Sequence, residues 1–487
     1  MAPAGAGTLS YAVRPRVVAH FLGQLGLMLA LLTGAPLLAS LLFAEFDATW
    51  RYGVVVLVLL AVSWPAARLR VPRGVQRNEA FTVTALAFLL APLAMVFPIH
   101  GATELDFVPA LFEAVSAATT TGLTMVHAPE AQPRTFLFAR AWMQWYGGLG
   151  IAVLSIALLM GQTVATHRLV DAAATETFVT TSRTHARRVL QVYGVLTVLA
   201  IATLSLAGGD FEEGLLHALA AVSTGGFSSH GDSLAGTPPV FASAVLAFSL
   251  LGAVTLPLYH GVLRERASRL RQDREWVFLL AAILVGAGLL AASGLLQEGL
   301  APGDAVRRAL FLSASAQSTA GFSPLAPAEL PAFALGVLMM QMLVGGSVGS
   351  TAGGVKLLNL LILFRALRLT LTRAGMGPHA VVPLRLFGQA IEPRTLERVL
   401  LLLVLYGLVV FFSWLVFLAH GMPPLPSLFD VISATGTVGL SAGVAGPELP
   451  STLALVLCFD MLAGRVEVVA LLVTLWPGTW IGRRQAT

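Results

Sequence analysis

Long apolar runs alternate with short polar segments along almost the whole chain. A helix needs about 20 apolar residues to cross the hydrocarbon core of a bilayer. Runs close to that length are found at residues 17–43, 52–66, 79–98, 136–160, 187–207, 238–262, 276–296, 331–369, 396–420 and 450–480. The pattern predicts an all-α polytopic membrane protein.

Two of these runs depart from the expected length. The run at 52–66 is short and ends at Pro65, whereas the run at 331–369 is long. The long run contains 345-GGSVGSTAGGVK-356, a glycine-rich stretch that ends in the only lysine of the chain. A glycine-rich break and a positive charge in the middle of a membrane-length segment need a functional explanation.

Composition supports a membrane protein and excludes several other classes. Of the 487 residues, 56% are hydrophobic and only 11% are charged, which is too apolar for a soluble surface. The basic excess is almost entirely arginine in short loops without interleaved aromatic residues, so we expect membrane lipid around the chain and no nucleic-acid partner. The single Cys458 cannot form an intramolecular disulfide.

Charge distribution predicts how the chain is oriented. Cytoplasmic loops are enriched in arginine, and arginines gather at every second boundary, at residues 14–16, 68–77, 168–188, 264–274, 373–398 and 483–484. Acidic residues occupy the opposite boundaries, at 45–47, 104–106, 210–213, 304 and 448. We therefore expect an even number of crossings and both termini on the cytoplasmic side of the membrane. The first run is too long for a cleaved signal peptide and should remain as a helix.

Four segments on the acidic side are similar to one another. They read 111-LFEAVSAATTTGLT-124, 215-LLHALAAVSTGGFSS-229, 310-LFLSASAQSTAGFS-323 and 428-LFDVISATGTVGLS-441. Each has a glycine preceded two residues earlier by threonine, five residues earlier by alanine and eleven residues earlier by leucine. The shared glycines are Gly122, Gly226, Gly321 and Gly439. Such a repeat predicts four copies of one structural unit.

Each copy is interpreted as a short helix followed by a re-entrant loop. Leucine and alanine recur at helical spacing, and the Thr/Gly stretch then disfavours the helix. Non-helical backbone at membrane depth is tolerated only where it is buried in protein or lines a water-filled cavity. Four such loops around one axis can replace the hydration shell of a monovalent cation with carbonyl oxygens. The alternative is four tight extracellular turns, in which Thr and Gly are only turn residues.

Acidic residues are expected near the outer mouth of such a pore. Asp106, Asp210, Asp304 and Glu113 would concentrate cations there. Glu113 and His217 occupy equivalent places in the first two short helices and are interpreted as local hydrogen-bonding partners. Arg140 and Gln144 follow the first repeat and are expected to brace its loop.

The fourfold pattern of helix, pore loop and helix resembles the Trk/Ktr/HKT superfamily of potassium transporters over nearly the whole chain. The resemblance also includes 144-QWYGGLGIAVL-154, 226-GFSSHGDS-233, the glycine-rich stretch and 461-MLAGRVEV-468. Two extra helices before the first repeat match the TrkH subfamily better than KtrB, although GSTAGG and GTVGLSAG are equally similar to KtrB. The resemblance implies a pseudo-tetramer in one chain, K+ as the transported ion, a homodimer and a cytoplasmic nucleotide-binding ring of the TrkA type. It also implies a location in the inner membrane of a bacterium.

The resemblance and the repeat together give a domain plan. It has two N-terminal helices in 1–78 and four repeats in 79–170, 171–275, 276–375 and 376–487. The pore loops are 107–124, 211–229, 305–323 and 426–441, and the intramembrane gate loop is 345–354. The expected filter residues are Thr120, Thr121, Gly122, Thr224, Gly225, Gly226, Thr319, Ala320, Gly321, Thr437, Val438 and Gly439. In the superfamily a serine in the first loop accompanies sodium preference, so Gly122 implies potassium.

The gate is assigned from the resemblance and from the unusual residues of two inner helices. The expected gate residues are Gly345, Gly346, Gly349, Ser350, Thr351, Gly353, Gly354, Lys356 and Arg465, accompanied by Ser347. Glycines destabilise a helix by about 1 kcal/mol each relative to alanine, which favours an unwound segment. A close helix crossing through Gly345 and Gly349 is the alternative. Lys356 could instead extend to the inner interface, and Arg465 could pair with Asp460 or Glu467.

Two further functional classes make different demands on the sequence. A proton- or sodium-coupled potassium symporter would need a titratable carboxylate on the pathway, for which Asp460 and Glu467 are the candidates. An enzyme is not expected, because the chain has no HExxH, no GxxxxGK followed by Ser or Thr, and no Ser/His/Asp set that can be placed together.

Overall fold

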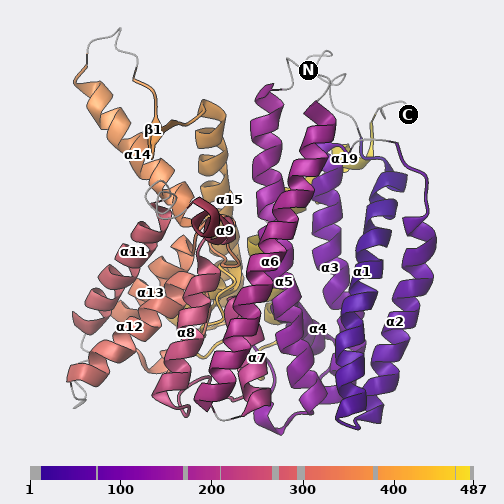
Figure 1. Ribbon diagram of the computed structural model, residues 1–487. Helices are drawn as coiled ribbons and strands as arrows, with labels where there is room; N and C mark the ends of the chain where they lie inside the picture. The colour runs from indigo at the N-terminus through magenta and orange to yellow at the C-terminus, as the bar shows by residue number, and fades with distance from the viewer. Residues whose placement is uncertain are drawn as a thin grey trace.

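The computed structural model describes residues 12–72, 75–167, 174–208, 210–265, 274–292, 302–376, 382–466 and 468–482. The described chain is almost entirely helical (Figure 1), with one small antiparallel hairpin formed by β1 (Arg385–Leu386) and β2 (Gln389–Ala390). The helical class expected from the apolar runs is therefore confirmed.

Four of the helices directly precede the repeated Thr/Gly loops and are called the short helices here. The short helices are α4 (Phe107–Ala118), α7 (Phe211–Val222), α12 (Pro302–Ser318) and α16 (Pro424–Thr435). The others are α1 (Pro15–Leu42), α2 (Phe46–Ala67), α3 (Arg77–Thr103), α5 (Arg134–His167), α6 (Ala174–Gly208), α8 (Pro239–Ala253), α9 (Leu256–Glu265), α11 (Glu275–Leu290), α13 (Ala332–Val344), α14 (Leu357–Ala374), α15 (Pro393–Ala419), α17 (Ser451–Val466), α18 (Val468–Leu475) and α19 (Pro477–Trp480).

The surface has the apolar character of a protein surrounded by lipid. Within the described residues, five helices are long and apolar enough to cross a membrane, namely α1, α2, α3, α15 and the Ala186–Gly208 part of α6. Large apolar side chains point outward from them, and Leu42 and Leu206 are 84% and 86% exposed. So large an exposed apolar surface would be unfavourable in water but is favourable in lipid, so the chain is a multi-pass membrane protein.

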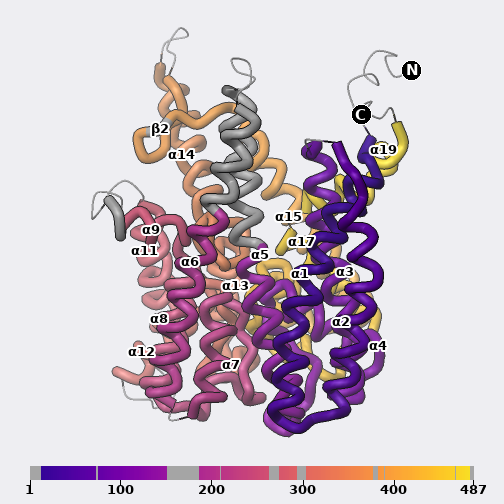
Figure 2. Tube along the Cα trace, turned by 45° about the vertical axis from the view of Figure 1, so that its right-hand side comes forward, coloured from indigo at the N-terminus to yellow at the C-terminus, as the bar shows by residue number. Residues whose placement is uncertain are grey.

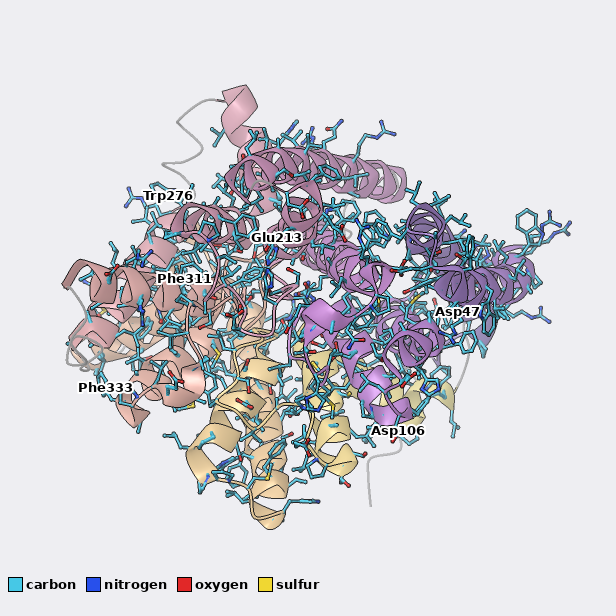
Figure 3. The ribbon with its side chains drawn as sticks, turned by 90° about the horizontal axis from the view of Figure 1, so that it is seen from below. Asp47, Asp106, Glu213, Trp276, Phe311 and Phe333 are labelled. Atoms are coloured by element: carbon cyan, nitrogen blue, oxygen red, sulfur yellow. The ribbon has the colours of Figure 1, made fainter. Side chains whose placement is uncertain are left out.

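The repeats surround a common centre. Seen from the face opposite α14 and α19, the short helices and their neighbours follow one another around the axis in chain order (Figure 3). Helices α1 and α2 pack against each other outside this arrangement (Figure 1). Helix α2 begins at Phe46, six residues before the expected run, so it is long enough to cross despite Pro65.

The two ends of the described chain lie together. The backbone N–H of Val13 donates to the carbonyl of Thr479 at 2.8 Å, and Arg14 pairs with the buried Glu79 of α3 at 2.7 Å. Helix α19 lies at the same end of the molecule as the projecting α14 and the β hairpin (Figure 2). The described parts of the arginine-rich segment, 365–376 and 382–398, therefore share one face with both described ends.

The apolar run at 238–262 is not one continuous helix. It consists of α8 and α9, which meet at an angle of 88°. Pro257 has no N–H to donate to the carbonyl of Ala253, which would be its helical partner. That carbonyl instead accepts the N–H of Ser347 at 3.0 Å, so the break is filled by the glycine-rich stretch.

Glycines let the inner helices approach the C-terminal ends of the short helices. In three repeats a glycine of the inner helix lies against the carbonyl of the residue four before the shared glycine. A Cβ added to that inner-helix glycine would fall within 3.0 Å of the carbonyl oxygen. The pairs are Gly147 with Ala118, Gly252 with Val222 and Gly464 with Thr435. The third repeat has no such contact, because its inner helix stops at Val344 and resumes at Leu357. The third repeat thus departs from the other three in this contact, at the glycine-rich stretch.

Candidate filter and gate

Each short helix ends in the same unusual backbone conformation. The threonine two residues before the shared glycine has a positive φ in all four copies, which is rare for a residue with a side chain. The values are 55° at Thr120, 53° at Thr224, 56° at Thr319 and 49° at Thr437. The shared glycines also have positive φ, at 91°, 77°, 74° and 99°. The sequence repeat is therefore a backbone repeat.

The residue between them closes each turn in the same way. Its N–H donates to the carbonyl five residues earlier, from Thr121 to Ser116 at 2.9 Å, Gly225 to Ala220 at 2.8 Å, Ala320 to Ser315 at 3.0 Å and Val438 to Ser433 at 2.8 Å. This bond gives a carbonyl near the C-terminal end of each short helix a backbone partner.

The four loops form a closed ring. A Cβ on each shared glycine would fall well within 3.0 Å of a carbonyl oxygen of the next loop. The contacts run from Gly122 to Gly225, from Gly226 to Ala320, from Gly321 to Val438 and from Gly439 back to Thr121. Isolated turns at a surface would not meet in this way, and only glycine fits at these four places.

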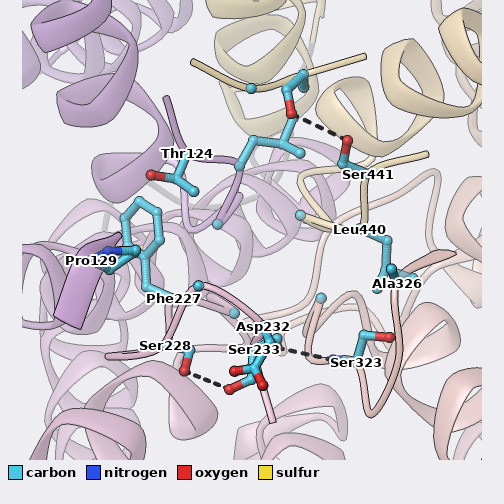
Figure 4. A pocket seen from close by; sticks show the side chains of 18 of the residues that line it. Thr124, Pro129, Phe227, Ser228, Asp232, Ser233, Ser323, Ala326, Leu440 and Ser441 are labelled. Atoms are coloured by element: carbon cyan, nitrogen blue, oxygen red, sulfur yellow. Dashed lines mark hydrogen bonds between the residues drawn. The ribbon is translucent and has the colours of Figure 1, made fainter. Parts of the chain in front are cut away.

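A cavity of about 500 Å³ lies outside the ring (Figure 4). All four shared glycines line it, with hydroxyl groups such as those of Ser228, Ser323 and Ser441. Its acidic residue is Asp232, which the sequence analysis did not single out as a site residue.

The acidic residues expected at the outer mouth do not line this cavity. Asp210 caps α7 by accepting from the N–H groups of Glu212 and Glu213, and Asp304 pairs with Arg307 at 3.1 Å. Glu113 is fully buried. The expectation that Glu113 lies at the outer mouth is therefore wrong, whereas its interpretation as a local hydrogen-bonding partner agrees with the bond that it accepts from Thr124 at 2.7 Å.

The stretch 345–356 passes directly beneath the ring as irregular backbone. Gly353 donates its N–H to the hydroxyl of Thr319 at 2.7 Å, and Gly354 donates to the carbonyl of Gly436 at 3.1 Å. The hydroxyl of Thr351 contacts the carbonyl of Val222 at 3.1 Å and receives a bond from Thr224 at 3.3 Å. The stretch is thus bonded to the ends of the second, third and fourth repeats.

The rest of the stretch is held from the side. Gly349 accepts from Leu256 at 3.2 Å, Ser350 donates its hydroxyl to the carbonyl of Ser347 at 2.6 Å, and Gly346 accepts from Leu357 at 3.1 Å. Gly345 and Gly349 have φ of 68° and 74°, so the alternative of a helix crossing is wrong at this place.

Charged side chains also contact the stretch. Lys356 donates its ammonium to the carbonyl of Ala352, so it is turned back toward the loop rather than extended to the interface. Glu275, at the start of α11, accepts the N–H of Val348 at 3.1 Å. Sequence reasoning missed Glu275, because it lies far along the chain in an unremarkable segment.

Arg465 reaches the stretch from α17. It is 3% exposed, and its guanidinium donates to the carbonyl of Thr351 at 2.9 Å and to that of Gly147 at 3.4 Å. Among the described residues no carboxylate pairs with it, and Asp460 accepts instead from Ser413 at 2.6 Å. Glu467, the other expected partner, lies outside the described residues. A buried guanidinium held only by carbonyls leaves its positive charge uncompensated within this part of the chain.

Other side chains brace the ring from behind. Gln144 donates its amide to the carbonyl of Gly225 and accepts the N–H of Phe227 at 3.3 Å, so it braces the second loop and not the first as expected. Gln317 donates to the carbonyl of Gly345 at 2.7 Å. Gln317 could have been noticed in the sequence. Four residues before the shared glycine it has a long amide side chain, whereas the other three repeats have the smaller Ala118, Val222 and Thr435 at that position.

Four re-entrant loops that meet at one axis define a class of membrane transporters built as pseudo-tetramers within one chain. The family model TrkH, described as a cation transport protein, matches residues 52–477. The chain therefore belongs to the TrkH family of cation transport proteins, and the resemblance stated from the sequence is confirmed.

Relatives and a solved structure extend over nearly the whole chain. The chain is 28% identical to the Trk system potassium uptake protein TrkH of Halomonas elongata, over 96% of this chain and 99% of that one. It is 26% identical to an uncharacterised cation transporter of Methanocaldococcus jannaschii, over 94% of both chains. The crystal structure of the potassium transporter TrkH from Vibrio parahaemolyticus superposes with a TM-score of 0.85 at 26% identity, covering 96% of this chain and 100% of that one.

Proposed function

We propose that this chain carries K+ into the cell through the ring of four loops. The relatives that are named as potassium uptake proteins support the choice of ion. The observation that carries the proposal is the closed ring, in which each shared glycine lies against a carbonyl of the next loop. Backbone carbonyls held at fixed spacing replace the hydration shell of a dehydrated monovalent cation.

The ring supplies its ligands from three positions of each loop. They are Thr120, Thr121 and Gly122, Thr224, Gly225 and Gly226, Thr319, Ala320 and Gly321, and Thr437, Val438 and Gly439. The C-terminal ends of α4, α7, α12 and α16 carry partial negative charge toward the same axis, which favours a cation. Asp232 in the outer cavity adds a negative charge on the entry side.

The stretch 345–354, with Lys356 and Arg465, acts as the gate in this proposal. Its bonds to Thr319, Gly436 and Val222 place irregular backbone across the path below the ring. The charge of Arg465 at the same level raises the barrier for any cation that leaves the ring. Conduction then requires the stretch to move away, which its glycines permit.

The membrane potential is a sufficient energy source. It contributes about 2.3 kcal/mol per elementary charge for each 100 mV, equivalent to about 50-fold accumulation. A coupled symporter is the second functional class. Asp460 does not support a symporter, because its carboxylate bonds to Ser413 of α15 rather than to the ring or the gate. The ion is the transported substrate, and no catalytic residue is assigned.

We extend the proposal to the cellular setting. We place the chain in the bacterial inner membrane, with both termini and the arginine-rich segment 365–398 in the cytoplasm. The projecting α14 and the β hairpin then form the docking face for a nucleotide-binding ring of the TrkA type, and the chain works as a homodimer. We propose the repeat boundaries expected from the sequence, at 79–170, 171–275, 276–375 and 376–487.

Growth at low potassium tests the proposal in cells. In a bacterial strain without its own K+ uptake systems, the wild-type chain is expected to restore growth at low K+. Gly321→Ala is expected not to restore it, because a Cβ there overlaps the carbonyl of Val438. Gly336→Ala, where a Cβ meets nothing within 4 Å, is the matched control. Equal growth with Gly321→Ala at equal membrane levels would contradict the ring as the conducting element.

A substitution in the gate is expected to act in the opposite direction. In Gly353→Ala the Cβ would overlap the carbonyl of Gly436 and the hydroxyl of Thr437, so the stretch would be displaced from beneath the ring. Uptake of K+ by purified protein in liposomes is expected to rise severalfold. Tracer uptake measures the change against Gly336→Ala, and a fall in uptake with unchanged folding would show that Gly353 supports the open state instead.

A further inference from the structure

One column of the repeat lies behind the ring and has no role in binding the ion. It is nine residues before each shared glycine and holds Glu113, His217, Leu312 and Asp430. All four side chains are fully buried. Buried polar groups need partners, and in this column the partners are the outer segments of the loops.

The three polar members hold their own loops in the same way. Each bonds to the hydroxyl two residues after the shared glycine, from Glu113 to Thr124 at 2.7 Å, His217 to Ser228 at 3.2 Å and Asp430 to Ser441 at 2.8 Å. Glu113 also accepts the N–H of Met125 at 2.5 Å. Asp430 accepts three further N–H groups, from Ala442 at 2.6 Å, Val444 at 3.1 Å and Ala445 at 2.5 Å.

The third loop has leucine in this column and is held from its neighbour. The N–H of Ser323 donates to the hydroxyl of Ser233 at 3.1 Å, and the N–H of Leu234 donates to the carbonyl of Ser323 at 3.0 Å. Figure 4 shows the chain of bonds from Ser228 through Ser233 to Ser323. The second and third loops are thereby joined.

Arg140 joins the first and second loops. Its guanidinium lies 3.5 Å from the carboxylate of Glu113 and donates to the carbonyl of Ser228 at 3.0 Å. It also lies over the ring of Phe227, 4.4 Å from the centroid. Arg140 is 2% exposed and lies on the boundary where Gly122 meets Gly225.

The other two boundaries of the ring lack a buried charged link. Among the described residues, the outer segments of the third and fourth loops share no hydrogen bond. The fourth and first loops meet in the pair of His127 and Glu448 at 3.9 Å, and both side chains are largely exposed. Arg140, paired with Glu113 inside the first repeat and bonded to the carbonyl of Ser228, is therefore the one buried charged side chain that links two loops in the described part of the structure.

We propose that Glu113 and Arg140 are positioning residues that determine ion selectivity by fixing the spacing between the first and second loops. The inference rests on the proposed function of the ring as a potassium filter. A larger ion is preferred only while the carbonyls are held at its coordination distance. Without the link, the first and second loops can move relative to each other, and the ring adapts to the smaller Na+.

The test compares K+ and Na+ tracer uptake by purified variants in liposomes. The double variant Glu113→Gln/Arg140→Met removes both charges, so neither is left buried and unpaired. We expect the double variant to carry both ions and its K+/Na+ uptake ratio to be about tenfold lower than that of the wild type. A tenfold change corresponds to the loss of one charge-assisted hydrogen bond. Leu312→Met changes the same column in the third repeat with little change in volume and is the matched control, expected to keep the wild-type ratio.

Arg140→Lys separates positioning from simple charge compensation. Lysine keeps the positive charge beside Glu113 but lacks the planar fork that reaches two acceptors at once. We expect this variant to unfold at a temperature near that of the wild type and still lose selectivity. A wild-type ratio in either Arg140→Lys or the double variant would overturn the inference, as would a folded double variant that carries neither ion. If the wild type itself does not discriminate K+ from Na+, the proposed function fails first.

Discussion

Gly122→Ser is expected to lower the preference for K+ over Na+ by about tenfold or more. Gly122 has φ of 91°, where a side chain costs about 1–2 kcal/mol. Its Cβ would also overlap the carbonyl oxygen of Gly225 in the second loop. The ring can accommodate serine only by moving apart at this boundary, which spoils the coordination distance for K+. The K+/Na+ tracer uptake ratio in liposomes measures the effect.

Gly446→Ser is the control for this variant. Gly446 lines the outer cavity, but a Cβ there meets nothing within 4 Å and its φ is not in the left-handed region. It should therefore keep the wild-type ratio. An unchanged ratio in Gly122→Ser would mean that the carbonyls of this boundary do not select the ion.

Arg465→Ala is expected to raise K+ uptake by about tenfold or more in the absence of any partner protein. Two unit charges about 4 Å apart interact by about 4 kcal/mol at an effective dielectric constant of 20. Removing the guanidinium lowers this barrier for a cation below the ring. It also removes the bond from Arg465 to the carbonyl of Thr351, which holds the gate stretch in place. Initial rates of tracer uptake into liposomes measure the increase.

Two comparisons make this result specific. Arg465→Lys keeps the charge but not both bonds, so its uptake should lie between those of the wild type and Arg465→Ala. Arg368→Ala removes an exposed arginine of α14, away from the ring, and should not change uptake. If Arg465→Ala conducts no better than the wild type, the glycine-rich stretch alone forms the barrier.

Repetition is the reason why so much of the ring could be predicted from the sequence. The column of Gly122, Gly226, Gly321 and Gly439 recurs at one spacing, and each of these residues has a positive φ in the structure. A single Thr-x-Gly would have been an ordinary turn motif. Four copies between apolar runs specify a shared backbone, because the same local constraint is met four times.

Features that depend on contacts between repeats could not be predicted as well from the sequence. Nothing in the apolar run 238–262 showed that α8 and α9 would meet at 88°, because Pro257 alone is also compatible with a kinked single helix. Asp430 stands in the same column as Glu113 and His217 and could have been recognised from the alignment. That Gln144 braces the second loop was not predictable, because a helix face cannot be assigned to a neighbour from spacing alone.

The most direct test of the central claim is tracer uptake by purified protein in liposomes under an imposed membrane potential and equal pH on both sides. It compares K+ with Na+ in the wild type and in Arg465→Ala, so that a closed gate cannot hide the filter. The four-loop filter predicts uptake that prefers K+ and needs no pH gradient, with the same preference in both proteins. Uptake that occurs only with a pH gradient, or that does not distinguish K+ from Na+, would contradict it.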